Sequence, residues 1–136
     1  MTDINAAIAA AASGMRAQTV RMRIAAENVA NANSTGTDPN QDPFRRRIPL
    51  LESTTLASGA TGVRVRGANF DMSAFREEYN PGHPAANEAG YVQLPNIDTL
   101  VEMMDLREAT RAYEANLNMI EAARTMTNRA LDMLRR

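Results

Sequence analysis

The sequence predicts a mainly α fold in which long N- and C-terminal helices pair as a coiled-coil-like unit, with a small β-rich or irregular domain between them. Two observations support this prediction. Apart from Gly14, all glycines and all six prolines lie between Gly36 and Pro95, so both ends can continue as helices while the middle turns repeatedly. Apolar side chains also recur every seven residues towards each end. We therefore divide the chain into residues 1–33, 34–96 and 97–136.

The N-terminal segment, residues 1–33, carries a heptad row. Its members are apolar and lie seven residues apart: Met1, Ile8, Met15, Met22 and Val29. A second row begins three residues further on, at Ile4, and is mostly alanine with one polar interruption at Gln18. This spacing predicts one continuous helix with an apolar stripe. Asparagine and serine side chains, followed by Gly36, then oppose another turn.

The C-terminal segment, residues 97–136, is predicted to be a second long helix. Thr99 is placed to cap its first turn, and Glu102 is placed to reach back three residues, which is the spacing of a capping box. Two rows of side chains follow at heptad spacing. The first row contains Ala112, Met119, Met126 and Met133, and the second contains Asn116, Ala123 and Ala130. Because alanine permits close approach and methionine adapts to varied neighbours, both rows suit contact between helices.

The middle segment is predicted to contain short strands and turns. Residues 63–66 alternate between valine and arginine, which is the period of a half-buried strand. Residues 44–51 and 90–94 are further strand candidates. Residues 79–82, which end in Pro81 and Gly82, fit a type II turn. Residues 37–43 are polar and contain proline, a composition that predicts a flexible loop.

Composition excludes several classes of function. The chain of 136 residues has no cysteine, which excludes disulfides, thiolate catalysis and zinc–thiolate sites. Its formal charge is −1, so we expect no nucleic acid or anionic membrane surface as a partner. No stretch is long and apolar enough to insert into a membrane, and Asp3 stands where a cleaved signal peptide carries lysine or arginine. We also expect no cofactor, metal or small-molecule substrate.

Two features bear on alternative activities. His83 is the single histidine, and in a Pro-Gly turn it is expected to be a surface residue rather than a general base or a ligand. The run Arg45, Arg46 and Arg47 has the charge to bind nucleic acid, but it lacks a broader basic face and interleaved aromatic residues. We expect these arginines to point outward from a strand edge, where charge opposes unwanted pairing.

The heptad rows favour a subunit that assembles with others. Two long helices packed only on each other form a narrow, alanine-rich core, so we expect neighbouring subunits to complete the burial of their apolar rows. The expected assembly interface comprises Ile4, Ile8, Met15, Met22, Val29, Ala112, Met119, Ala123, Met126, Ala130 and Met133. Two other classes remain open: a cytoplasmic coiled-coil adaptor, which shares the heptads, and a small hydrolase that uses His83.

Several motifs resemble those of a known family. Residues 13–18 (SGMRAQ) and 26–31 (AENVAN) are similar to the N-terminal signature of the flagellar axial proteins, which form rods and hooks. Residues 80–84 (NPGHP), 90–92 (GYV) and 112–116 (AYEAN) narrow the resemblance to the proximal rod proteins of the bacterial flagellar basal body, the FlgC type. The likeness extends over nearly the whole chain and the order of its motifs.

This resemblance implies a structural subunit of the proximal rod, with no enzyme activity, catalytic residue or cofactor. The terminal helices would form the inner tube of a hollow drive shaft, which transmits torque and lets later subunits pass, with the middle domain outside. The implied partners are copies of the chain itself, other flagellar rod proteins and the flagellar type III export apparatus. The implied location is the basal-body rod across the periplasm, reached without a cleaved signal peptide.

Overall fold

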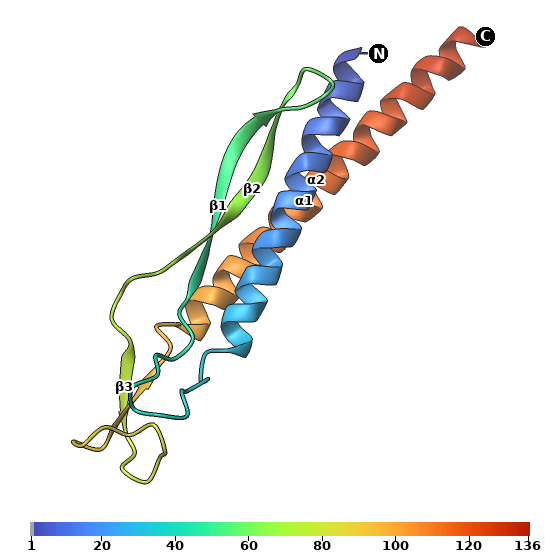
Figure 1. The fold of residues 1–136 in the computed structure, drawn as a ribbon. Coiled ribbons are helices and arrows are strands. Elements are labelled where there is room, and N and C mark those ends of the chain that lie inside the picture. Colours follow the sequence, from blue (N-terminus) through green and yellow to red (C-terminus); the bar gives the residue numbers. More distant parts are fainter. Residues whose placement is uncertain (1) are drawn as a thin grey trace.

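A computed structural model describes residues 2–136; Met1, the first member of the N-terminal heptad row, lies outside the described residues. The elements in chain order are α1 (Thr2–Ala30), β1 (Arg47–Thr55), β2 (Thr61–Phe70), β3 (Arg76–Tyr79), β4 (Tyr91–Leu94) and α2 (Thr99–Leu134). Two long helices thus flank four short strands in the sequence (Figure 1). The predicted fold class, mainly α with a small β-rich middle, is confirmed.

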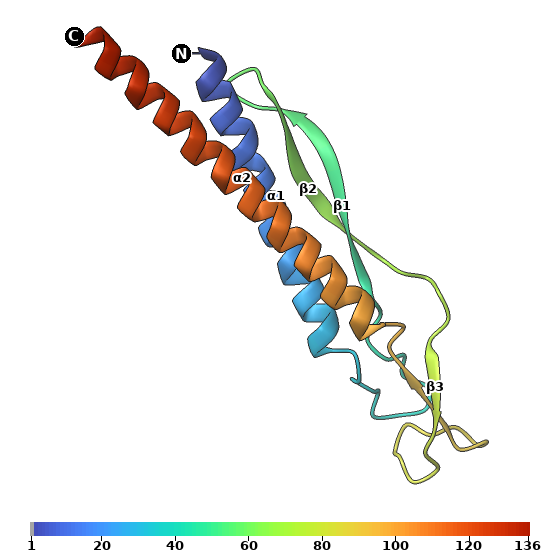
Figure 2. The same cartoon turned by 180° about the vertical axis from the view of Figure 1, so that it is seen from behind.

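The helices α1 and α2 pack side by side in opposite directions. The N-terminus of α1 and the C-terminus of α2 therefore lie at the same end of an elongated molecule (Figures 1 and 2). The buried apolar residues of the helices are mostly alanine: Ala11, Ala17, Ile24, Ala25, Ala109 and Ala123. Such small side chains allow close packing but supply a thin core, in agreement with the narrow core expected from the sequence. Neither helix is long and apolar enough to cross a membrane over the residues described.

A glycine in α1 allows a side chain of α2 to approach the backbone of α1 closely. An added Cβ on Gly14 would lie 2.6 Å from Nδ2 of Asn116, well inside normal contact distance. A glycine in a helix interior costs roughly 1 kcal/mol relative to alanine. The contact with Asn116 accounts for its presence in α1.

The helix ends follow local side-chain chemistry, with one correction. Nδ2 of Asn31 donates a hydrogen bond to the carbonyl of Glu27 at 2.8 Å, and α1 ends at Ala30. At the start of α2, the expected cap by Thr99 is wrong. Asp98 is the N-cap, and its side chain accepts a hydrogen bond from the backbone N–H of Leu100 at 3.0 Å. The side chain of Glu102 does not reach back to the cap, because it is buried against other segments.

The strands β1 and β2 form an antiparallel hairpin that lies along α1 (Figure 1). The predicted strand at 63–66 lies within β2, whereas the candidate at 44–51 overlaps a strand that begins later and extends to Thr55. The register shifts at a bulge between Leu50 and Leu51. Buried Ser13 of α1 accepts a hydrogen bond from the N–H of Val63 at 3.1 Å, which fastens the hairpin to the helix.

The strands β3 and β4 form a second two-stranded sheet beyond the ends of the helices (Figure 1). The candidate at 90–94 contains β4. The predicted type II turn is wrong in type and position. The turn closes between the carbonyl of Asn80 and the N–H of His83 at 3.1 Å, and Gly82 is not one of the three glycines with positive φ. Since a type II turn requires positive φ at its third residue, this turn is of another type.

The polar loop at 37–43 contains neither helix nor strand, as predicted. Its side chains hydrogen-bond to nearby groups of the loop itself. Oε1 of Gln41 accepts from both the N–H and the hydroxyl of Thr37, at 3.1 and 3.0 Å.

Candidate assembly surface and the junction beside it

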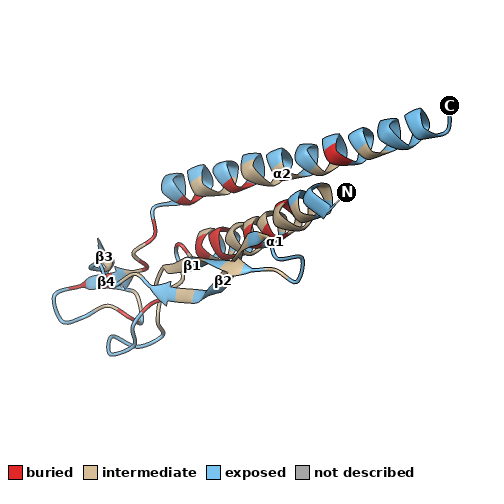
Figure 3. Ribbon diagram, turned by 90° about the horizontal axis from the view of Figure 1, so that it is seen from above, coloured by how far each residue is buried: buried red, intermediate tan, exposed pale blue. Residues whose placement is uncertain are grey.

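The helix α2 presents a row of exposed methionines along one side. Met119, Met126 and Met133 are 54%, 54% and 71% exposed. Among the helices and strands, α2 contacts only α1, and outside these elements Arg46 contacts Glu102 and Asp105 near its start. Figure 3 shows the resulting pattern, in which few positions on α2 are buried and the turns nearest the C-terminus are exposed. This exposed apolar row is the candidate assembly surface of the subunit.

The predicted interface residues occupy three environments. Those of α1, together with the first residue of the α2 row, are half-buried: Ile4, Ile8, Met15, Met22, Val29 and Ala112. Four residues of α2 are exposed: Met119, Met126, Ala130 and Met133. Ala123 is only 2% exposed, against α1 of the same subunit. Ala123 therefore serves pairing within the subunit, while the exposed methionines are free to meet other chains.

A buried asparagine joins α1 to the start of β1. The side chain of Asn28, 1% exposed, pairs with both backbone groups of Arg47: Nδ2 donates to its carbonyl at 2.9 Å, and Oδ1 accepts from its N–H at 3.1 Å. Nδ2 also donates to Oε2 of Glu102 at 3.2 Å. One amide side chain thus holds α1, β1 and α2 together.

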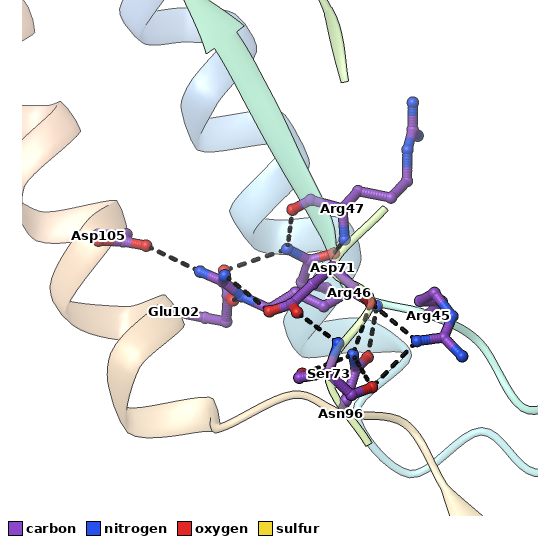
Figure 4. A network of polar contacts seen from close by, with 9 residues as sticks. Arg45, Arg46, Arg47, Asp71, Ser73, Asn96, Glu102 and Asp105 are labelled. Carbon is purple, nitrogen blue, oxygen red and sulfur yellow. Dashed lines mark hydrogen bonds and ion pairs between the residues drawn. The ribbon is translucent and has the colours of Figure 1, made fainter. Parts of the chain in front are cut away.

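Arg46 carries the charge at this junction, which Figure 4 shows from close by. Its guanidinium contacts the carboxylates of Glu102, Asp105 and Asp71, the latter two at 3.4 and 3.5 Å. Burial, the largest influence, lowers the pKa of Arg46, but the hydrogen bond with Glu102 and the three negative charges together raise it above its ordinary value. The guanidinium is therefore held as a cation between α2 and the segment that follows β2.

A second asparagine completes the junction on the side of the middle segment. Oδ1 of Asn96 accepts from the N–H of Arg46 at 2.9 Å, and its Nδ2 donates to the carbonyl of Asp71 at 2.8 Å. Nη1 of Arg45 donates to the carbonyls of Asp71 and Ser73 at 2.9 and 3.0 Å (Figure 4). Five parts of the chain therefore meet in one polar cluster: the last turns of α1, the segment before β1, the segment after β2, the segment before α2, and the first turns of α2.

The expectation for the three consecutive arginines is wrong. Arg45 binds backbone carbonyls and lies over the ring of Phe75 at 4.1 Å, and Arg46 lies among carboxylates. Arg47 pairs with Glu27 at 3.0 Å. All three guanidinium groups are engaged within the chain, Arg45 by backbone carbonyls and an aromatic ring, and Arg46 and Arg47 by carboxylates distant in sequence. They neither protect a strand edge nor form a free basic patch.

His83 has a local structural role. Its Nδ1 accepts from the N–H of Ala85 at 3.0 Å, which leaves Nε2 as the donor to the hydroxyl of Thr35 at 3.2 Å. The histidine thus ties the turn after β3 to the segment that follows α1. Over residues 2–136, no three histidine or acidic side chains are grouped closely enough to hold a metal ion.

Sequence reasoning missed most of the junction. The available signal was Asn28, a polar residue of modest helix propensity within a segment predicted to be helical. The spacing of Glu102 from Thr99 predicts a capping box, but its partners are Asn28 and Arg46. Nothing local marks Asn96 or Asp71 as their partners.

The chain is similar in sequence to known flagellar basal-body rod proteins. The family described as flagellar basal body rod FlgEFG protein C-terminal matches residues 88–133. The chain is 42% identical to the flagellar basal-body rod protein FlgC of Agrobacterium fabrum, over 99% of this chain and 98% of that protein. The FlgC of Aquifex aeolicus is 37% identical, with coverage of 97% and 98%, and that of Bacillus subtilis is 38% identical, with coverage of 90% and 92%.

These relatives bear out the resemblance seen in the sequence motifs and support a structural subunit of the flagellar basal-body rod. They belong to a family of structural proteins rather than enzymes, and nothing favours the coiled-coil adaptor. The chain is therefore a member of the flagellar basal-body rod protein FlgC family.

Proposed function

We propose that this rod subunit assembles through the exposed face of α2, with Met119, Met126 and Met133 at its centre. The observation that carries the proposal is the contrast between the two helices. The β1–β2 hairpin and α2 both pack on α1, whereas α1 is the only helix or strand of the described residues that packs on α2. A helix of a neighbouring subunit, either a copy of this chain or another rod protein, is the partner that an apolar row at heptad spacing fits.

The free energy available from burying these methionines suits a polymer of many subunits better than a tight dimer. Burying the exposed half of one methionine side chain is worth on the order of 1 kcal/mol. Three such residues bind weakly in a single contact. The same row repeats in every subunit, however, so many weak contacts add up in a polymer.

The wider setting of the subunit is also part of this proposal. Residues 1–33 and 97–136 form the inner tube of the rod, and residues 34–96 lie outside it, which suits a hairpin packed on α1 alone. The rod crosses the periplasm, transmits torque and lets later subunits pass. The flagellar type III export apparatus delivers the chain without a cleaved signal peptide.

The substitution Met126→Asp tests the assembly surface. In the free subunit the new carboxylate stays hydrated, so the free energy of unfolding should change by less than about 1 kcal/mol. In an assembled seam the same charge is desolvated, at a cost of several kcal/mol unless it is paired. We expect a non-motile strain without complete rods in electron micrographs, although the purified subunit keeps its stability.

Asn128→Asp is the matched control, because residue 128 is exposed and lies about 200° around the helix from residue 126. This strain should remain motile. His83→Ala should also assemble rods, whereas a His83-dependent hydrolase would make it the more severe change. Complete rods in the Met126→Asp strain, at matched expression, would count directly against the surface.

A further inference from the structure

The buried carboxylate of Glu102 lies in the first turn of α2 and is 2% exposed. A buried carboxylate requires a cation and hydrogen-bond donors, since burial strongly disfavours an isolated charge. Neither of the two helices supplies that cation. Within the described residues, the cation in contact with Glu102 is Arg46, which belongs to the segment before β1.

The neighbouring arginines, Arg21 and Arg47, pair with groups other than Glu102. Arg21 and Arg47 line the same cavity of about 290 Å³ beside Glu102. Arg21 donates to Gln18 at 3.0 Å, and Arg47 pairs with Glu27 at 3.0 Å. Neither is within ion-pair distance of Glu102 in the structure, so the carboxylate depends on Arg46.

We propose that Glu102 and Arg46 form a latch that makes pairing of α1 and α2 conditional on docking of the middle segment. When residues 45–47 are undocked, closing the helices in their observed register would bury Glu102 without its cation. Asn28 would lose both backbone partners at Arg47 in the same step. The helices therefore stay apart until the segment before β1 is in place. This coupling is a property of one subunit and needs no neighbour.

The latch is asymmetric, which gives it a distinctive signature. The side chain of Arg46 is 20% exposed and has two further carboxylates, Asp71 and Asp105. Loss of the charge on Glu102 therefore leaves Arg46 paired and partly hydrated. Loss of Arg46 leaves Glu102 buried with Asn28 as its remaining hydrogen-bond donor, in the presence of two like charges. Removal of the cation should be far more damaging than removal of the anion.

Hydrogen exchange on the full-length chain, read by mass spectrometry, tests the latch. The amides around Ala109 and Ala123 report helix pairing, and those of β1 and β2 serve as an internal reference. In Arg46→Met, exchange of the helix amides should accelerate by about a hundredfold or more, with a much smaller change in the hairpin. Glu102→Gln should change the rates by less than about tenfold. The double variant should return close to the parent, because it removes the buried charge that needed a cation.

The control variant is Arg64→Met, which removes the partner of Glu52 from the exposed face of the hairpin and should leave helix exchange unchanged. Protected helices in Arg46→Met would overturn the latch, as would unprotected helices in the parent chain. A double variant as fast as Arg46→Met would show that Arg46 acts through packing instead of charge. If Arg46→Met fails to fold at all, recovery of the fold in the double variant supports the latch, and failure to recover overturns it.

Discussion

Asn28→Asp is the substitution that most directly probes the junction, because it changes one buried atom and almost no volume. Nδ2 of Asn28 donates to the carbonyl of Arg47 at 2.9 Å and to Oε2 of Glu102 at 3.2 Å. An aspartate at this position places a carboxylate oxygen against both acceptors. Two hydrogen bonds are replaced by two repulsive contacts in a site that is 1% exposed.

The expected loss follows from these contacts. A hydrogen bond to a neutral group contributes about 0.5–1.5 kcal/mol, and one to a charged group about 1.5–3 kcal/mol. Burial of a second carboxylate beside Glu102 adds to this loss. We expect the free energy of unfolding to fall by about 3–5 kcal/mol. For a chain of this length, that corresponds to a fall in Tm of roughly 10–17 °C.

Urea unfolding followed by circular dichroism at neutral pH measures this loss. Asn118→Asp is the matched control, because it makes the same change at an exposed position of α2. The control should stay within about 0.5 kcal/mol of the parent. If Asn28→Asp is no less stable than the control, the hydrogen bonds assigned to Asn28 do not hold the three segments together, and the reasoning is refuted.

Two further predictions concern helix packing and acid stability. Gly14→Ala should lower Tm although alanine favours helix, because its Cβ meets Asn116 at 2.6 Å; in an Asn116→Ala background the same change should raise Tm. Thermal unfolding of the four proteins tests this reversal, and a loss of equal size in both backgrounds would contradict it. Hydrogen bonds from Ser73, and then the charge of Arg46, lower the pKa of Asp71 in the folded chain. The ionised carboxylate therefore stabilises the fold fully above the pKa that aspartate has in the unfolded chain, about 4. This contribution is lost as the pH falls from there through the lower pKa of the folded state. Asp71→Asn should therefore cost most stability at neutral pH and converge with the parent in acid; urea unfolding profiles that stay parallel from about pH 7 to 3 would be inconsistent with this role.

Both long helices could be predicted from sequence because their signals are local. Heptad spacing records which residues share a face, and the confinement of proline to the middle of the chain marks where the helices stop. The same pattern predicted the row of Met119, Met126 and Met133. Its exposure within the subunit depends on the β1–β2 hairpin, which packs on α1 and leaves α2 open.

The polar junction could not be predicted in this way. Glu102 fits a capping box by spacing alone, yet it bonds to Asn28 across 74 residues and to Arg46 across 56 residues. Three consecutive arginines look like a surface charge run until the chain brings Asp71, Asp105 and Glu27 around them. In each case the local rule is sound, and a partner distant in sequence overrides it.

The sequence by itself determined the two helices, the strand-and-turn middle, the apolar rows and the family resemblance. Each of these is recorded in residues that are neighbours along the chain or one heptad apart. Only the tertiary structure decided which polar side chains are buried together and which apolar row stays exposed. The reason is physical: the free energy of a buried charge depends on the groups around it in space, and folding brings those groups together from segments that are far apart in the sequence.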